Sequence, residues 1–357
     1  MKRWTKYMML TVLMVGLFAG CGKTAKKVDM SLPKEGDGTI TATMDYDFKE
    51  GMVISPLTGE LTDEKIANNR VVTCMINNID VAMPQSGLSY ADIMYECVVE
   101  GGITRLMGVF QDYKNIPKLG PVRSARHYYV DYSNEYDAIY AHFGQTKYAV
   151  SEMEALHTNE LSGLSALGSV VYFRDNSRVA PHNAYTDGKK IVKGIKKAKF
   201  EKKNTMTAPR FTFNMEQEEL TAEDAKNAPV VKLTFNAYSH PYFEYNKKDG
   251  LYYRFQYGAK HIDDQTGEQL AYENIIIQFA GYSNIDKKGY QDLALVSSGD
   301  GYYITEGKRV PITWEKNSKS DFTNFFTADG NALKVNPGKT WITVFPDNNK
   351  KGVSFKE

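Results

Sequence analysis

The sequence predicts a fold of mixed α and β class (α+β or α/β), in which an N-terminal α/β domain is followed by a mainly β C-terminal domain. The 357 residues are 42% hydrophobic and 24% charged, which is typical of a globular protein and long enough for about two domains. Strand-like apolar runs alternate with helix-like stretches as far as about residue 185, whereas strand-like runs dominate after Pro209. We therefore expect the α/β domain over residues 51–200 and the β-rich domain over residues 201–357.

A secretory signal peptide is predicted over residues 1–20. Lys2, Arg3 and Lys6 form a positively charged segment, and a mostly apolar run follows as far as Ala19. The run is shorter than the roughly 20 apolar residues of a membrane-spanning helix, so an uncleaved anchor helix is the weaker alternative. LFAGC, which ends at Cys21, resembles a bacterial lipobox, whose cysteine takes a diacylglycerol. We therefore expect Cys21 to be lipidated and to hold the protein at the extracytoplasmic face of the cell membrane.

Residues 21–50 are rich in Lys, Thr, Asp and Gly, and we interpret them as the lipidated cysteine and a flexible tether. The chain has 44 Lys and Arg against 43 Asp and Glu, a formal charge of +1. Removal of residues 1–20 takes away three basic residues and no acidic one, which leaves −2. Such a near-neutral balance argues against a nucleic-acid partner.

In the α/β domain, the runs RVVTCMIN, SYADIMYECVVE and TRLMGVFQD indicate strands. Between residues 124 and 143, tyrosines recur at every fourth position, at 128, 132, 136 and 140. This spacing places them on one face of a helix, so a helix with a tyrosine stripe is predicted there.

Eight lysines lie between Lys189 and Lys203, with apolar residues between them. The pattern predicts an amphipathic helix, which either lies on anionic lipid or wall polymer or is a solvated helix that leads to a linker. Farther along, the segment KKDG at residues 247–250 separates two alternating aromatic runs. It predicts the turn of a β-hairpin in the β-rich domain.

Cys74 and Cys97 are the cysteines that remain after Cys21, and both fall in apolar strand-like runs. An extracytoplasmic compartment permits a disulfide, but two buried thiols fit the same pattern. The chain has no pairing of Cys and His at zinc-finger spacing.

Arginines are dense in two loop-like segments, GPVRSARH (120–127) and YFRDNSRVAPHN (172–183). Arginine in loops rich in Gly, Ser and Pro is suited to bidentate binding of carboxylate or phosphate. We therefore expect a pocket for an anionic group at loop ends of the α/β domain. Its candidate residues are Arg123, Arg126, Arg174, Arg178 and His182, with Arg105 nearby in EGGITR. The alternative is that these arginines pair with Glu100, Asp131 or Asp175 and hold loops in place.

Fewer sequence features favour a catalytic role for these residues. Ser124, His142 and Asp175 could form a triad, but Ser124 is not in a G-x-S-x-G elbow. Cys97 has apolar neighbours, which predict an inert buried thiol. No HExxH motif is present, and the P-loop, dinucleotide and calcium-loop motifs are also absent. We therefore expect no metal and no cofactor, and we retain His142 and His182 as candidates for a general base.

Several motifs in a common order resemble those of the YerB-type lipoproteins of Gram-positive bacteria, a domain family of unknown function. They are the lipobox, SPLTGE, NNIDVAMPQSG (77–87), EGGITR, GPVRSAR, FRDNSRVAPHN, and ITWEK and PGKTWI near the end. The resemblance covers roughly residues 53–347. It implies two domains, a lipid anchor and a polar site in the first domain. The motif residues carried over are Glu100, Arg105, Arg123, Ser124, Arg126, His142, Arg178, His182 and Asn183.

Three functions follow, and the first two come from different classes. The first is a lipid-anchored binding or scaffold protein of the cell envelope, whose site recognises an anionic group of a wall polymer, a peptide or a small molecule. The second is a wall-acting hydrolase or transferase with His142 or His182 as general base. A third, a structural partner of another envelope protein, would dock through the aromatic face of the β-rich domain. The expected partners are the membrane, through the lipid anchor, and one of these envelope components.

Overall fold

The structure is a computed structural model that describes residues 50–356. The predicted signal peptide, the lipidation site Cys21 and all but the last residue of the predicted tether lie outside the described residues. Residues 51–357 form one compact unit. None of the helices in the described range is long and apolar enough to cross a membrane.

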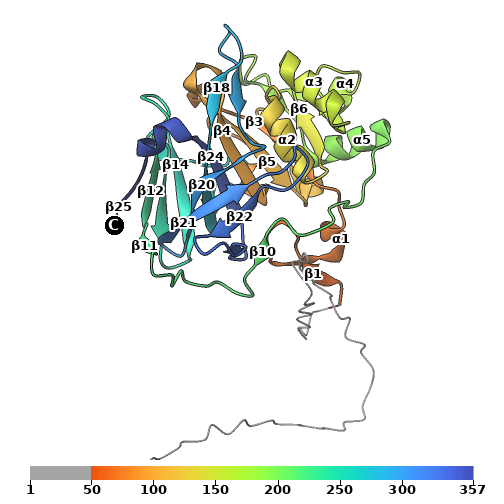
Figure 1. Ribbon diagram of the computed structural model, residues 1–357. Helices are drawn as coiled ribbons and strands as arrows, with labels where there is room; N and C mark the ends of the chain where they lie inside the picture. Colours follow the sequence, from red (N-terminus) through yellow and green to blue (C-terminus); the bar gives the residue numbers. More distant parts are fainter. Residues whose placement is uncertain (1–49, 357) are drawn as a thin grey trace, which may run out of the picture. The chain divides into compact units, whose positions relative to one another are not determined.

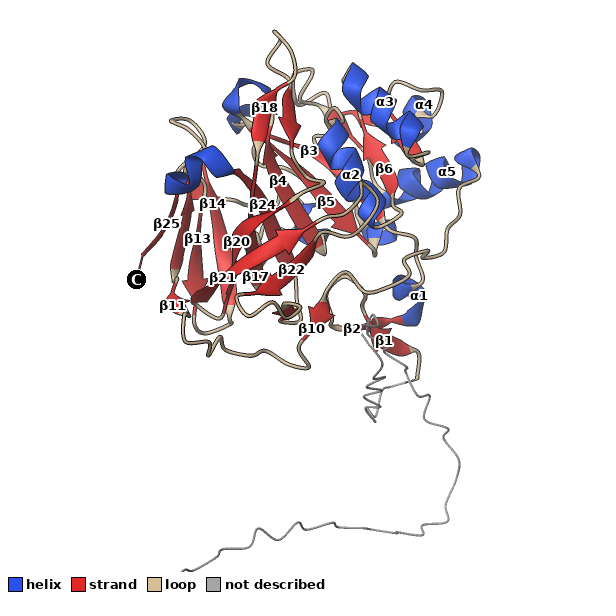
Figure 2. Ribbon diagram, in the orientation of Figure 1, coloured by secondary structure: helices blue, strands red, loops and turns tan. Residues whose placement is uncertain are grey.

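An eleven-stranded mixed sheet runs through this unit (Figures 1 and 2). In sheet order its strands are β11 (Lys226–Asn227), β21 (Lys308–Glu315), β20 (Ser298–Thr305), β17 (Asn274–Ala280), β24 (Thr340–Pro346), β4 (Ile93–Val98), β5 (Thr104–Phe110), β3 (Val72–Asn78), β6 (Ile139–His142) and β7 (Glu160–Ser162), with β22 (Asn324–Thr327) beside β21. At its middle, β24 pairs in parallel with β4, and Thr340 lies opposite Ile93. Strands from the two halves of the chain therefore build one continuous sheet.

A second, antiparallel sheet comes entirely from the C-terminal half. Its strands are β15 (Ala259–Lys260), β14 (Leu251–Gln256), β13 (Tyr242–Asn246), β12 (Val230–Leu233) and β25 (Val353–Lys356), with β16 (Ala271–Tyr272) beside β14. The hairpin predicted at residues 247–250 is confirmed, because β13 and β14 pair across it and Gly250 takes the left-handed conformation, with φ of 76°. Four two-stranded ribbons complete the strands of residues 50–356: β1 (Met52–Ile54) with β2 (Leu61–Asp63), β8 (Phe173–Arg174) with β9 (Ala184–Tyr185), β10 (Thr212–Phe213) with β23 (Lys334–Val335), and β18 (Tyr282–Asn284) with β19 (Gln291–Leu293).

The α-helices of the described range all lie before residue 200, in the part of the chain that was predicted to be α/β. They are α1 (Glu64–Ala67), α2 (His127–Glu135), α3 (Lys147–Ala155), α4 (Gly168–Val171) and α5 (Gly188–Ala198). Short 3-10 turns are η1 (Asp80–Ala82), η2 (Leu88–Tyr90), η3 (Glu100–Gly102), η4 (Tyr113–Asn115) and η5 (Asp347–Gly352).

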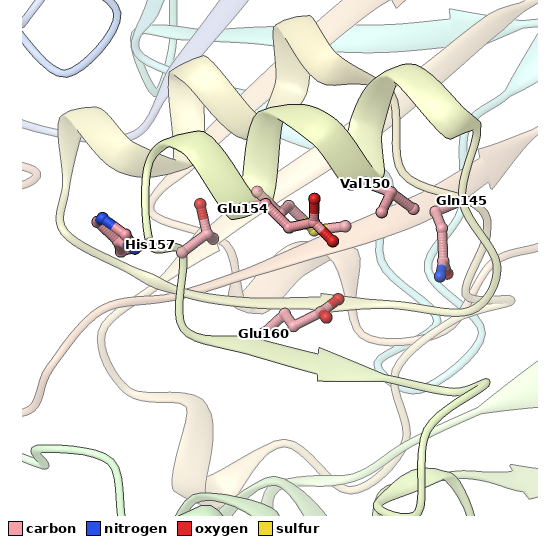
Figure 3. Close-up of a pocket in the computed structure, with 7 residues that line it drawn as sticks. Gln145, Val150, Glu154, His157 and Glu160 are labelled. Atoms are coloured by element: carbon pink, nitrogen blue, oxygen red, sulfur yellow. The ribbon is translucent and has the colours of Figure 1, made fainter.

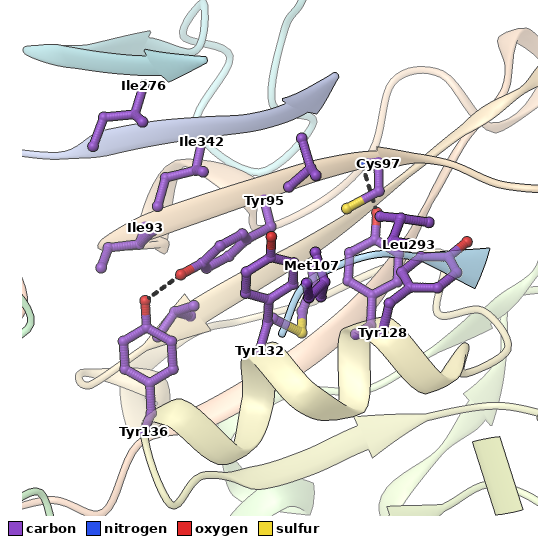
Figure 4. Packing of buried hydrophobic residues seen from close by; sticks show 14 of the residues in the cluster. Ile93, Tyr95, Cys97, Met107, Tyr128, Tyr132, Tyr136, Ile276, Leu293 and Ile342 are labelled. Carbon is purple, nitrogen blue, oxygen red and sulfur yellow. Dashed lines mark hydrogen bonds between the residues drawn. The ribbon is translucent and has the colours of Figure 1, made fainter. Parts of the chain in front are cut away.

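The tyrosine stripe is shorter than predicted. Tyr128, Tyr132 and Tyr136 lie along α2 and its C-cap and pack on the sheet, where the Tyr136 and Tyr95 hydroxyls are 2.7 Å apart (Figure 4). The prediction of one helix over residues 124–143 is wrong, because Asp137 takes a positive φ of 43° and the chain turns into β6. Tyr140 is therefore a strand residue.

The two faces of the central sheet carry separate cores. Cys97 faces the core that includes the α2 tyrosines, whereas Cys74 faces the opposite core, which includes Trp341 and Phe345. In addition, β5 lies between β3 and β4. Both thiols are free and buried, so the alternative of two buried thiols is confirmed. Burial raises the pKa of both thiols far above the ordinary value.

The lysine-rich segment forms α5. Asp187 caps its first turn by accepting from the backbone N–H of Lys190 at 2.8 Å. Ile191 and Ile195 are fully buried against the protein. The apolar face of this helix is therefore used for packing, and its lysines point outward.

The parallel strands β3, β6, β7, β4, β24 and β17 give the main sheet two distinct ends. The chain enters at the amino-terminal end: Thr58 accepts a hydrogen bond from Gly338, two residues before β24 begins (Figure 1). The opposite end, where these strands finish, is the usual position of a ligand site in an open sheet.

Candidate functional site

The predicted site residues converge at the carboxyl ends of β3, β4 and β6. The GPVRSAR segment crosses this end, held by hydrogen bonds from Asn77 to the Pro121 carbonyl and from Arg123 to the Met75 carbonyl, each 2.9 Å. β5 runs in the opposite direction, so its second residue, Arg105, lies at the same end. Pairing of the sheet thus gathers side chains that are distant in the sequence.

Arg126 forms a two-point ion pair with Glu100. Its Nε and Nη2 donate to the two carboxylate oxygens of Glu100 at 2.6 and 2.5 Å, and its Nη1 donates to the Ala125 carbonyl at 2.8 Å. The hydrogen bonds and the charge of Glu100 raise the pKa of Arg126 against the opposing effect of burial. For Arg126, the geometry matches the predicted alternative in which an arginine pairs with Glu100 and holds a loop in place.

Arg105 is almost completely buried, and its Nη1 donates to the Ser124 carbonyl at 2.8 Å. The same carbonyl accepts from Arg126 Nη1 at 3.3 Å, so Ser124 is tied into the cluster by its backbone. Burial and the nearby positive charges of Arg126 and Arg123 lower the pKa of Arg105 to about 10.

Arg123 has few partners. Its Nη1 donates to the Pro181 carbonyl at 3.2 Å, while its Nε is buried without a hydrogen-bond partner among residues 50–356. Burial and the positive charges of Arg126 and Arg174 lower the pKa of Arg123. Within the described part of the chain, Arg126 with Glu100 is the one ion pair made by the arginine cluster, which we define as Arg105, Arg123, Arg126 and Arg174. The cluster therefore carries an excess of positive charge.

Arg174 is the last residue of β8, and Asn183 directly precedes β9. Arg174 Nη1 donates to Asn183 Oδ1 at 2.8 Å, and its guanidinium lies 4.4 Å from the centre of the Phe143 ring. Asn183 is buried and donates from Nδ2 to the Arg178 carbonyl at 3.2 Å. This amide orients Arg174.

Arg178 points elsewhere. Its two terminal nitrogens donate to the carbonyls of Ala82 and Pro84 at 3.0 and 2.7 Å. Arg178 therefore clamps the loop after β3, and the structure does not place its guanidinium in the arginine cluster.

His182 lies beside Arg123, with its Nδ1 at 2.8 Å from Asn77 Nδ2. Because the amide nitrogen donates, Nδ1 accepts and the ring proton is on Nε2. Partial burial and the charge of Arg123 lower the pKa of His182, which favours the neutral ring. In the tautomer assigned from the hydrogen bond with Asn77, His182 therefore offers its Nε2–H as a donor.

His142 has no exposed surface and is held from both sides. Its Nδ1 lies 2.9 Å from the Gly144 carbonyl and its Nε2 lies 2.7 Å from Glu160 Oε2. Both partner atoms are hydrogen-bond acceptors, so each ring nitrogen of His142 already faces an acceptor within the protein. This geometry favours a structural role for His142 over that of a general base.

A cavity of about 510 Å³ lies between α3 and β7 (Figure 3). It is lined by Gln145, Val150, Met153, Glu154, His157, Thr158 and Glu160. The arginines of the cluster are not among these lining residues. The cavity was not predicted from sequence, because its walls come from a helix and a strand with no motif of their own.

The sequence analysis also assigned no role to the side chains of NNIDVAMPQSG, although the motif itself stood out. Gln85 Nε2 donates to the Asn77 carbonyl at 3.0 Å, and its Oε1 lies 2.8 Å from His261 Nε2. His261 in turn accepts from Arg254 at 3.2 Å, and Arg254 forms a fully buried ion pair with Glu96 at 3.0 Å. The loop thus connects the arginine cluster to a buried polar network shared with the second sheet.

Among the residues that the structure describes, no group of three or more His, Cys, Asp or Glu side chains is arranged to hold a metal ion. The site is therefore a cluster of guanidinium groups, amides and one half-buried histidine.

Sequence comparisons identify relatives of the chain. Residues 57–201 match the N-terminal domain, and residues 231–342 the C-terminal domain, of "Protein of unknown function (DUF3048)". The protein named "Putative lipoprotein YerB" of Bacillus subtilis (strain 168) is 34% identical over 304 residues, which cover 85% of this chain and 89% of that protein. The crystal structure of the YerB protein from Bacillus subtilis matches with a TM-score of 0.76 and 33% identity, over 85% of this chain and 100% of that one.

The two matched domains follow the predicted order of an α/β part and a mainly β part. The predicted boundary at residues 200 and 201 stays a prediction, because the central sheet continues through both parts. The chain is more than 30% identical, over most of both sequences, to the protein named "Putative lipoprotein YerB". The chain belongs to the YerB family of two-domain lipoproteins of unknown function.

Proposed function

We propose that the protein is a lipid-anchored binding protein of the extracytoplasmic cell envelope, and that its arginine cluster binds an anionic group of an envelope component. The lipid anchor is the predicted one at Cys21. The candidate ligands are a wall polymer, a peptide carboxylate or a small anionic molecule. Arg105 and Arg126 shape the site, and Arg123, Arg174 and His182 supply the donors.

The single observation that carries this proposal is the state of Arg123. Its buried Nε lacks a partner in the described part of the chain, and its positive neighbours lower its pKa. A buried donor without an acceptor costs about 1–3 kcal/mol, and the nearby positive charges add repulsion. An anion with two acceptor oxygens would satisfy the guanidinium fork and offset this charge.

Two further features support an anionic ligand. α2 begins beside the cluster, and its N-cap Arg126 makes no side-chain capping bond, so the partial positive charge of the helix N-terminus adds to the same region. The cluster also lies at the end of the sheet opposite to the point where the chain enters. A site at that end favours ligands that approach from the side away from the start of the described fold.

The geometry supports binding over acid-base catalysis. A general base needs an unprotonated nitrogen within reach of substrate. His142 uses both nitrogens on Gly144 and Glu160, and His182 keeps its proton on Nε2. The hydrolase or transferase alternative therefore lacks a histidine base in this arrangement.

The test is co-sedimentation of the chain starting at residue 22 with purified Gram-positive wall material, combined with mass spectrometry of released fragments. We expect sedimentation without chemical change, and loss of sedimentation in Arg123→Gln. Arg123→Lys should restore it only in part, because lysine lacks the planar fork.

Arg309→Gln is the matched control. Arg309 lies on β21, at the far side of the sheet, and stacks at 4.1 Å on the Phe355 ring. Equal loss of sedimentation in this control would mean that overall charge, and not the arginine cluster, holds the protein to the wall. New fragments released by the wild-type protein would support the enzyme alternative.

A further inference from the structure

The outer face of α5 carries an uncompensated row of lysines. Lys189, Lys193, Lys196 and Lys197 are exposed, and at 100° per residue they lie within an arc of about 100°. Lys199, Lys202 and Lys203 continue the exposed positive charge beyond the helix, where the exposed Glu201 offsets part of it. We call these seven lysines the lysine face.

None of the ion pairs found within residues 50–356 involves the lysine face. Lys196 and Lys197 lie in the last turn of α5, where positive charge is favourable, but the rest of the arrangement opposes helix stability. Lys189 lies in the first turn, where positive charge is unfavourable, and Lys189 with Lys193 and Lys193 with Lys197 are like charges four residues apart. Charge held at a cost to the helix indicates an anionic partner outside this fold.

The apolar face of α5 excludes insertion of the helix into a bilayer. Ile191 and Ile195 are buried in the protein core, so the helix cannot turn them toward lipid without unpacking. Any partner therefore contacts the lysine ammonium groups at a surface.

The position of the lysine face relative to the start of the fold selects the partner. Its last residues lie against the segment that follows α1: the Lys202 carbonyl accepts from the Arg70 N–H at 2.8 Å, and Lys203 pairs with Asn69. This is the end of the sheet at which the chain enters. The 29 residues between Cys21 and Gly51 can span at most about 100 Å, which keeps that end within reach of a bilayer that holds Cys21.

We infer that the lysine face binds the anionic phospholipid headgroups of the membrane to which the predicted lipid on Cys21 attaches the protein. The acyl chains of the diacylglycerol predicted on Cys21 anchor the protein by themselves, so the lysine face adds orientation to this attachment. Contact through the lysine face orients the fold with its entry side toward the lipid. The arginine cluster, at the other end of the sheet, is then directed away from it.

Vesicle sedimentation tests this inference with the chain starting at residue 22, which lacks the lipidation site and retains the whole compact unit. The probes are vesicles of phosphatidylglycerol and phosphatidylcholine in equal parts, and vesicles of phosphatidylcholine alone. We expect binding to the anionic vesicles in low salt, weaker binding in high salt, and none to the neutral vesicles. Absence of binding to the anionic vesicles would overturn the inference.

The variant K189Q/K193Q/K196Q/K197Q should lose vesicle affinity by at least tenfold, since each lysine near an anionic surface contributes roughly fivefold. The matched control K247Q/K248Q/K287Q/K288Q removes the same charge from exposed turns of the C-terminal half and should keep wild-type affinity. Equal losses in both variants would show a nonspecific charge effect and refute the inference.

A soluble poly(glycerol phosphate) distinguishes wall polymer from lipid. If the α5 variant loses retention on this polymer while its vesicle binding is unchanged, the lysine face is a polymer site and the membrane inference is wrong. Arg123→Gln should leave vesicle binding unchanged, so a failure here and a failure of the arginine-cluster proposal are separately visible.

Discussion

Replacing Arg123 should abolish ligand binding with little effect on folding, whereas replacing Arg126 should destabilise the protein. Arg123→Gln removes one hydrogen bond, to the Pro181 carbonyl, worth about 0.5–1.5 kcal/mol. It also removes repulsion from Arg126 and Arg174, which acts in the opposite direction. We therefore expect its free energy of unfolding to stay within about 1 kcal/mol of the wild-type value.

Arg126→Gln removes two charge-assisted hydrogen bonds to Glu100 and one to the Ala125 carbonyl. Charge-assisted bonds contribute about 1.5–3 kcal/mol each, and partial exposure of Glu100 reduces the sum. We expect a loss of about 2–4 kcal/mol. The two variants remove the same charge from the same cluster, so each is the control for the other.

Urea unfolding of both variants, analysed with a common slope, measures the difference. Ligand affinity is measured in parallel, with an expected loss of about tenfold to a hundredfold for Arg123→Gln, since an unmade charged hydrogen bond costs about 1.5–3 kcal/mol. A destabilisation above about 2 kcal/mol in Arg123→Gln would show that Arg123 is structural. Equal stability of the two variants would refute the predicted contrast between Arg123 and Arg126.

Three other outcomes are expected. Burial and a neighbouring carboxylate raise the pKa of Asp131 to about 8, so the folded protein retains a proton that the unfolded chain loses near pH 4. The free energy of unfolding in urea should therefore fall as the pH rises from about 4 to 8. Asp131→Asn should flatten this pH dependence, and an unchanged dependence in the variant would assign it to other groups. Cys74 and Cys97 should resist iodoacetamide at pH 8 until urea unfolds the chain, and rapid labelling of the native protein would contradict their burial. Arg254→Met should lower the free energy of unfolding by about 3–5 kcal/mol, because it leaves Glu96 buried without its partner. The double variant with Glu96→Gln should recover part of this loss, and absence of recovery would assign the loss to packing.

Local patterns in the sequence predicted the elements whose structure depends on neighbours along the chain. The turn at residues 247–250 and the lysine-rich helix were predicted at the correct places, because turn chemistry and 3.6-residue periodicity act over a few residues. The tyrosine spacing was misleading beyond Tyr136, since four residues per repeat cannot reveal a single left-handed residue at Asp137. Periodicity therefore located the helix but not its end.

The sequence predicted which residues belong to the candidate site but not how they are arranged in space. The density of arginine in two loop segments identified Arg123, Arg126 and Arg174, which the structure brings together with Arg105. It could not show that Arg178 turns to the Ala82 and Pro84 carbonyls. A guanidinium has the same sequence signature whether it meets a ligand, a carboxylate or a backbone carbonyl.

The sequence by itself determined the order of an α/β part and a β part, the apolar and charged faces of α5, and the presence of a polar, arginine-rich region. These depend on residue type and short spacing. Only the tertiary structure decided that β24 pairs with β4 across almost 250 residues of chain, and that Cys74 and Cys97 face opposite cores. It also decided that Arg123 Nε has no hydrogen-bond partner among residues 50–356. Those outcomes are set by contacts between distant segments, whose pairing and register become defined only when the two sheets and their helices pack together.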